Sequence, residues 1–106
     1  MAKLVYTEGG TEHEFVLTPG RTAFTIGRNP MCDLRINNPS ISRKHAELRI
    51  DASGGVTVYD LNSSNGTYVN GRREQQSALV DGDELLIGEF EMLYVSDSVE
   101  SQQKIG

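Results

Sequence analysis

Cysteine, long apolar runs and helical periodicity are all scarce in this sequence of 106 residues. The lone Cys32 excludes an internal disulfide framework, and no residues around it have the spacing of zinc ligands, so it is predicted to be a small buried or half-buried filler. No stretch reaches the apolar length that a membrane span needs, and the first residues lack the apolar core of a signal peptide. These absences predict a cytoplasmic domain without a metal or another cofactor.

Negative charge dominates the chain, but it is unevenly distributed. The formal net charge of −5 argues against a general nucleic-acid binder, which usually presents a basic face. Residues 21–50 nevertheless hold six basic and two acidic residues, a local net charge of +4, so the rest of the chain carries −9. Two interpretations stay open on charge alone, a local anion site or chance clustering on a solvated face.

The apolar pattern is that of an all-β protein. No window of twelve residues has helical periodicity without a Gly or Pro, and short alternating runs recur between turn signals. This spacing predicts a two-sheet antiparallel β-sandwich of about eleven short strands. The strand candidates are 3–7, 12–17, 22–26, 34–36, 46–50, 56–60, 67–69, 72–74, 78–80, 84–87 and 90–95. We expect one domain over residues 1–96 and a polar, disordered tail or linker over 97–106.

Two local patterns sharpen this prediction. In the run 46–50, the residues Ala46, Leu48 and Ile50 alternate with polar ones and are expected to face the core. Asn70-Gly71 is the clearest hairpin signal, because a type I′ turn needs positive φ at both central residues. By contrast, residues 28–45 have little strand character and should form a long surface connection, where functional residues often gather.

Three groups of polar residues lie at predicted strand ends. Arg28 follows a predicted strand directly after Gly27, Ser42 precedes the strand that opens at Ala46, and Asn65 precedes the strand that opens at Thr67. In a sandwich, such strand ends can converge on one rim. A metal-free oxyanion site needs a bidentate donor surrounded by short hydroxyl or amide donors. The sequence therefore predicts an anion site rather than a bond-breaking one.

These segments also carry a family resemblance. Gly27-Arg28, Ser42-Arg43-Lys44-His45-Ala46 and the run from Asp60 to Gly71, Asp-Leu-Asn-Ser-Ser-Asn-Gly-Thr-Tyr-Val-Asn-Gly, resemble the signature of the forkhead-associated (FHA) domain. The order and spacing match, and the resemblance extends over residues 3–95. It implies a β-sandwich of about eleven strands that binds phosphothreonine peptides through loops at one end.

The resemblance implies how the phosphate would be held. Arg28 would grip it, Ser42 would donate to a second phosphate oxygen, and Arg43 would add a further donor. Many members of the family have other residues at the Arg43 position. All three residues come from the basic segment.

It also implies how the peptide around the phosphate would be read. Ser64 and Asn65 would line the niche for the threonine γ-methyl group and hold the peptide backbone. Threonine is more usual at the Ser64 position, and the smaller side chain is expected to loosen that niche. Ser40 falls where the family often contacts the third residue after the phosphothreonine, but it is small and uncharged and indicates no strong preference.

Supporting rather than binding roles are expected for Gly27, His45, Gly66 and Asn70. Ser42-x-x-His45 places a hydroxyl near an imidazole, but no nucleophile elbow surrounds it and no oxyanion donor pair is identifiable. The resemblance makes His45 a residue that braces the loops by hydrogen bonds to the backbone. Asn70 would form its turn and would either do only that or also pin a neighbouring loop.

The predicted function is thus a phosphothreonine-binding module that connects proteins downstream of a Ser/Thr kinase, and not an enzyme. Its partner would be a phosphothreonine-containing protein or peptide, with no nucleic acid and no membrane, and the isolated domain would be monomeric. The alternative is a phosphate-independent scaffolding or oligomerisation domain, which would capture its partner equally well after phosphatase treatment.

Overall fold

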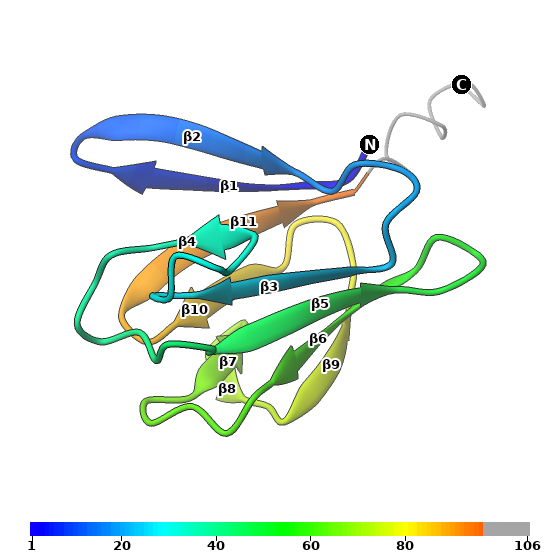
Figure 1. Cartoon of the computed structure of the whole chain (residues 1–106). Helices are drawn as coiled ribbons and strands as arrows, with labels where there is room; N and C mark the ends of the chain where they lie inside the picture. The colour runs from blue at the N-terminus through cyan, green and yellow to red at the C-terminus, as the bar shows by residue number, and fades with distance from the viewer. Residues whose placement is uncertain (97–106) are drawn as a thin grey trace.

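The chain folds as a sandwich of two β-sheets, and the computed structural model describes residues 1–96 (Figure 1). Within these residues there are eleven strands and no helix, which confirms the predicted fold class. The expected tail, 97–106, lies outside the described residues.

Both sheets are antiparallel except for one parallel pair, β3 with β4. The larger sheet has the order β2 (Thr11–Val16), β1 (Lys3–Glu8), β11 (Phe90–Val95), β10 (Glu84–Ile87), β7 (Thr67–Val69) and β8 (Arg72–Arg73). The smaller sheet has the order β4 (Leu34–Arg35), β3 (Ala23–Gly27), β5 (Ala46–Ile50), β6 (Val56–Asp60) and β9 (Gln76–Leu79). Five strands have the predicted bounds, and the other six shift by one or two residues.

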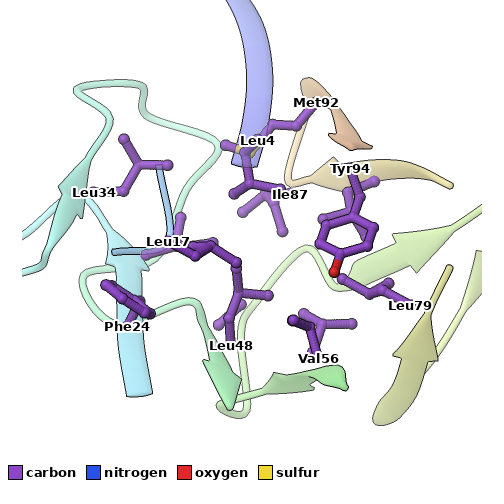
Figure 2. Close-up of a cluster of buried hydrophobic side chains, with 14 of the residues drawn as sticks. Leu4, Leu17, Phe24, Leu34, Leu48, Val56, Leu79, Ile87, Met92 and Tyr94 are labelled. Carbon is purple, nitrogen blue, oxygen red and sulfur yellow. The ribbon is translucent and has the colours of Figure 1, made fainter. Parts of the chain in front are cut away.

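Alternating apolar side chains from the two inner faces fill the space between the sheets (Figure 2). As predicted, Ala46 and Leu48 on β5 are fully buried, and Ile50 packs at the edge of the same core. Each fully buried aliphatic side chain stabilises the fold by about 1.5–3 kcal/mol relative to an exposed one. This core fixes the strand ends and, with them, the loops that follow.

The β7–β8 hairpin turns at Asn70-Gly71, as its sequence predicts. Both residues have positive φ, 51° and 85°. The Asn70 side chain does more than turn the chain: its Nδ2 donates to Asp83 Oδ1 at 2.9 Å, and its Oδ1 accepts from the Glu84 amide at 2.9 Å. Asn70 therefore also pins the turn before β10.

Hydrogen bonds of the Asp33 carboxylate to Arg21 and Thr25 hold the β3–β4 connection in place. The Asp33 carboxylate accepts from Arg21 Nη1 at 2.8 Å, from the Thr25 amide at 2.8 Å and from Thr25 Oγ1 at 3.1 Å. The Arg21 hydrogen bond, followed by that of the Thr25 amide, lowers the pKa of Asp33 to about 2. The loop that begins with Arg28 is thus closed by a carboxylate that stays ionised well into acid.

We expect the Asp33→Asn variant to lose up to about 1 kcal/mol of unfolding free energy at pH 7, because the pair is partly exposed and screened by solvent. A lowered folded-state pKa stabilises the protein above the unfolded-state pKa, and this contribution disappears as pH falls toward about 2. Urea unfolding of both proteins should therefore show a difference that shrinks below about pH 4. A difference that persists unchanged at pH 2.5 would contradict this assignment. The exposed Glu12→Gln variant is the control, with an expected change below about 0.5 kcal/mol at pH 7.

Candidate functional site

Three loops meet at the end of the sandwich away from the N-terminus (Figure 1). They are the β3–β4, β4–β5 and β6–β7 connections, and backbone hydrogen bonds tie them together. The Arg28 amide donates to the Ser42 carbonyl at 3.0 Å, and the Leu61 amide donates to the His45 carbonyl at 2.9 Å. Residues far apart in the sequence are thus held on one rim.

Arg28 opens the β3–β4 loop with its side chain exposed to solvent. Its Nε donates to the Ile41 carbonyl at 3.0 Å, which fixes the direction of the guanidinium. Within residues 1–96, no hydrogen bond or ion pair uses either Nη group of Arg28. Both NH2 groups of an exposed, tethered guanidinium therefore stay available, and such a fork can bind an oxyanion in a bidentate way.

Ser42 lies on the adjacent loop with its hydroxyl polarised as a donor. Its Oγ accepts a hydrogen bond from the Ser64 amide at 3.1 Å. A hydroxyl has one proton and two lone pairs, so this contact leaves the proton available. Ser42 can thus donate to an anion that Arg28 holds.

His45 is fully buried beneath these loops, and both of its ring nitrogens are occupied. Nδ1 accepts from the Ser42 amide at 3.0 Å, and Nε2 lies 2.8 Å from the Gly66 carbonyl, to which it must therefore donate. The ring joins the β4–β5 and β6–β7 loops through their backbones. Neither nitrogen is left to take a proton from the Ser42 hydroxyl, so this pair lacks the geometry of a nucleophile and its base.

The β6–β7 loop presents Ser64 and Asn65 to solvent beside Ser42. Asn65 Nδ2 donates to the Ser40 carbonyl at 2.8 Å, which leaves its Oδ1 as an acceptor toward solvent. An exposed carboxamide oxygen of this kind suits an extended peptide, whose amides need acceptors. The roles of Ser64 and Asn65 in reading a peptide stay predictions.

Ser40 is more heavily engaged than its sequence context suggested. Its Oγ donates to Asn38 Oδ1 at 2.8 Å and accepts from the Glu89 amide at 2.9 Å. Its single proton is therefore spent inside the protein, and the residue joins the β4–β5 loop to the β10–β11 turn. Its part in peptide specificity stays a prediction. A peptide could contact only the side of the Ser40 hydroxyl that does not face Asn38 and Glu89.

Two glycines of the rim are required for different reasons, Gly27 for a close approach of two loops and Gly66 for its positive φ. A Cβ on Gly27 would lie 2.1 Å from the Arg43 carbonyl oxygen, a backbone atom with little room to move. Gly66 has φ of +89°, and a Cβ there would lie 2.7 Å from Arg73 Nε. Arg43, the neighbour of Ser42, is exposed to solvent, and its role as a further phosphate donor stays a prediction.

The sequence analysis gave no role to Asp60, which holds the β6–β7 loop together from within. Its carboxylate accepts from the Ser63 amide and hydroxyl and from Thr67 Oγ1. Burial alone would raise the pKa of Asp60, but the hydrogen bonds from Ser63 and Thr67 outweigh burial and hold it below its usual value. The spacing Asp-x-x-Ser was the available signal, because such side chains commonly cap turns.

Cys32 is buried behind the same rim, as predicted, and its Sγ donates to the Arg43 carbonyl at 3.3 Å. Across residues 1–96, no group of three or more His, Cys, Asp or Glu side chains has a metal-binding arrangement. The same part of the chain contains no helix that could cross a membrane.

Comparison with known proteins converges on one family. The model of the FHA domain matches residues 24–88. The oxoglutarate dehydrogenase inhibitor of Corynebacterium efficiens is 40% identical over 72 residues, which cover 68% of this chain and 50% of the inhibitor. The chain therefore spans about half the length of this relative.

Solved structures agree over a larger share of the chain. The FHA domain of CT664 from Chlamydia trachomatis has a TM-score of 0.82 and 33% identity, over 90% of this chain and 96% of that one. An FHA domain from a study of phosphothreonine-dependent interactions has a TM-score of 0.77 and 29% identity, over 90% and 95% of the two chains.

Proposed function

The chain belongs to the forkhead-associated (FHA) domain family, and on this premise we propose that it binds phosphothreonine peptides and so connects proteins under the control of a Ser/Thr kinase. The single observation that carries the proposal is the pair Arg28 and Ser42, which keep donors for a ligand after their own hydrogen bonds are made. A phosphothreonine brings nearly two negative charges and three strong acceptors at neutral pH. Its phosphate accepts from donors of the kind that Arg28 and Ser42 keep free.

We propose that the β6–β7 loop selects phosphothreonine over phosphoserine. Ser64 and Asn65 stand beside Ser42, so a γ-methyl group attached to the bound phosphoamino acid would lie against them. Contact with this loop removes apolar surface of the methyl group from water, and this burial stabilises the complex. Arg43 is proposed as an additional phosphate donor from the exposed side of the rim.

We expect phosphothreonine to bind more tightly than phosphoserine in the same peptide. Burying one methyl group contributes about 0.8 kcal/mol, which corresponds to about fourfold in the dissociation constant. Isothermal titration of the two phosphopeptides and of the unphosphorylated threonine peptide measures both selectivities. Equal binding of the two phosphopeptides would remove the methyl niche from the proposal, and equal binding of the unphosphorylated peptide would remove the phosphate site.

A binding role without catalysis is proposed for this domain. Relatives of this chain include an enzyme inhibitor and a regulator of glycogen accumulation. His45 spends both ring nitrogens on backbone groups, which supports bracing rather than acid–base chemistry. The absence of a second cysteine fits a reducing compartment, and we propose a cytoplasmic, monomeric domain.

A further inference from the structure

The acidic residues of the basic segment are already neutralised by two of its arginines. Arg21 Nη1 lies 2.8 Å from Asp33 Oδ1, and Arg49 Nε lies 2.8 Å from Glu47 Oε1. The Arg49 guanidinium also covers the ring of Tyr59. These two arginines have partners inside the domain.

Four cations of the same segment have no ion-pair partner among the described residues. Arg28, Arg35, Arg43 and Lys44 are exposed, and none of them forms an ion pair with another described residue. A phosphothreonine supplies nearly two negative charges, so about two positive charges of this rim remain uncompensated when it binds. A ligand with one phosphate therefore leaves part of the site's charge unused.

Arg35 is the best placed of these cations to serve a second anion. The parallel pairing of β3 with β4 puts Arg35 opposite Gly27, directly beside Arg28. Its Nε donates to the Arg28 carbonyl at 3.0 Å. Arg28 is tethered in the same way, through its Nε to the Ile41 carbonyl.

The hydrogen bond that each of these arginines makes through Nε matters for binding. A guanidinium already fixed through Nε has less freedom to lose when its Nη groups bind a ligand. Neither Nη group of Arg35 has a hydrogen bond with the part of the chain that the structure describes. Arg35 thus shares two features with Arg28: its guanidinium is held through Nε, and its Nη groups are available to a ligand.

We propose that Arg35 forms a second anion subsite beside the phosphate subsite, so that the domain selects phosphothreonine peptides with another anionic group close by. The ligand chemistry is a carboxylate or a second phosphate. This inference rests on the proposed function and adds a residue that reads the peptide sequence. The net charge of −9 outside residues 21–50 disfavours extended polyanions and confines the attraction to this rim.

The test is a titration series on one phosphothreonine peptide with neutral flanks. Aspartate is placed singly at each of the neighbouring positions on both sides, and phosphoserine is placed at each of the same positions in a second series. We expect the best aspartate to tighten binding about two- to fivefold, as for a solvent-exposed ion pair, and the second phosphate to tighten it about tenfold or more.

Variants assign this gain to Arg35. Arg35→Gln should abolish the gain and change the affinity for the neutral phosphopeptide by less than about threefold, because the lost charge is exposed to solvent and lies outside the first phosphate subsite. Arg49→Gln is the matched control and should keep the gain. Arg35→Glu should instead favour lysine at the same peptide position. The three variants are read beside the wild type in the same buffer.

The possible results separate two failures. If no anionic residue improves binding, or if Arg35→Gln keeps the full gain, the second subsite is refuted while the phosphate site stands. If a gain appears with the second phosphate only, the subsite is for phosphate and not for carboxylate. If the neutral phosphopeptide does not bind at all, the proposed function fails as well.

Discussion

Replacing Arg28 with alanine is expected to weaken binding of a phosphothreonine peptide at least ten- to a hundredfold. The variant loses its charge-assisted hydrogen bonds to the phosphate, and a single hydrogen bond to a charged group already contributes about 1.5–3 kcal/mol, which sets this lower bound. The fold should survive, because the Arg28 side chain is exposed and its only bond within the described residues runs from Nε to the Ile41 carbonyl. Isothermal titration measures the affinity, and thermal unfolding checks the fold.

Two further variants show whether the effect depends on the guanidinium fork. Arg28→Lys keeps the charge but not the bidentate geometry, so an intermediate loss is expected. Arg49→Ala removes an arginine of the same segment that is paired with Glu47 and should leave the affinity within about twofold. Unchanged affinity in Arg28→Ala would refute the phosphate assignment.

Replacing His45 with alanine is expected to cost about 2–5 kcal/mol of unfolding free energy and also to weaken phosphopeptide binding. The side chain is fully buried, and its removal leaves a cavity and strips the Ser42 amide and the Gly66 carbonyl of their partner. Both loops then lose their common brace, so Ser42 is no longer held toward the phosphate. Urea unfolding and titration of the same variant measure the two effects together.

His13 provides the control for this prediction. It is exposed on β2, where it stacks on Tyr6 with ring centroids 5.4 Å apart. His13→Ala should cost less than about 1 kcal/mol and should not change peptide affinity. An His45→Ala variant with wild-type stability would contradict the bracing role and reopen a chemical one.

The strands were largely predictable because their pattern is local. Alternation along β5 and the turn at Asn70-Gly71 depend on residues next to one another, so periodicity alone located them. β9 is the informative exception: it begins two residues before the predicted position, at Gln76. Gln76 belongs to the strand because it pairs with Tyr59 on β6, and the residues next to Gln76 in the sequence do not predict that pairing.

The motifs predict which residues form the candidate site, but they do not predict the contacts that orient those residues. The spacing of the motifs named Arg28, Ser42 and Asn65, yet the contacts that orient them join residues far apart in the chain. Asn65 reaches the Ser40 carbonyl 25 residues away. Arg35 carried no motif at all, and its tether to the Arg28 carbonyl becomes visible only when β3 and β4 are paired. Hydrogen bonds of this kind depend on tertiary structure and produce no periodic pattern in the amino-acid sequence.

The most direct test of the phosphothreonine proposal is a titration of the isotope-labelled chain followed by NMR. A phosphothreonine peptide selected from a degenerate pool is added, and the same peptide is added again after phosphatase treatment. The proposal predicts shifts of the backbone amides around Arg28, Ser42 and Ser64 with the phosphopeptide, and their loss after dephosphorylation. Equal shifts with both peptides, or shifts confined to the outer faces of the sheets, would contradict it.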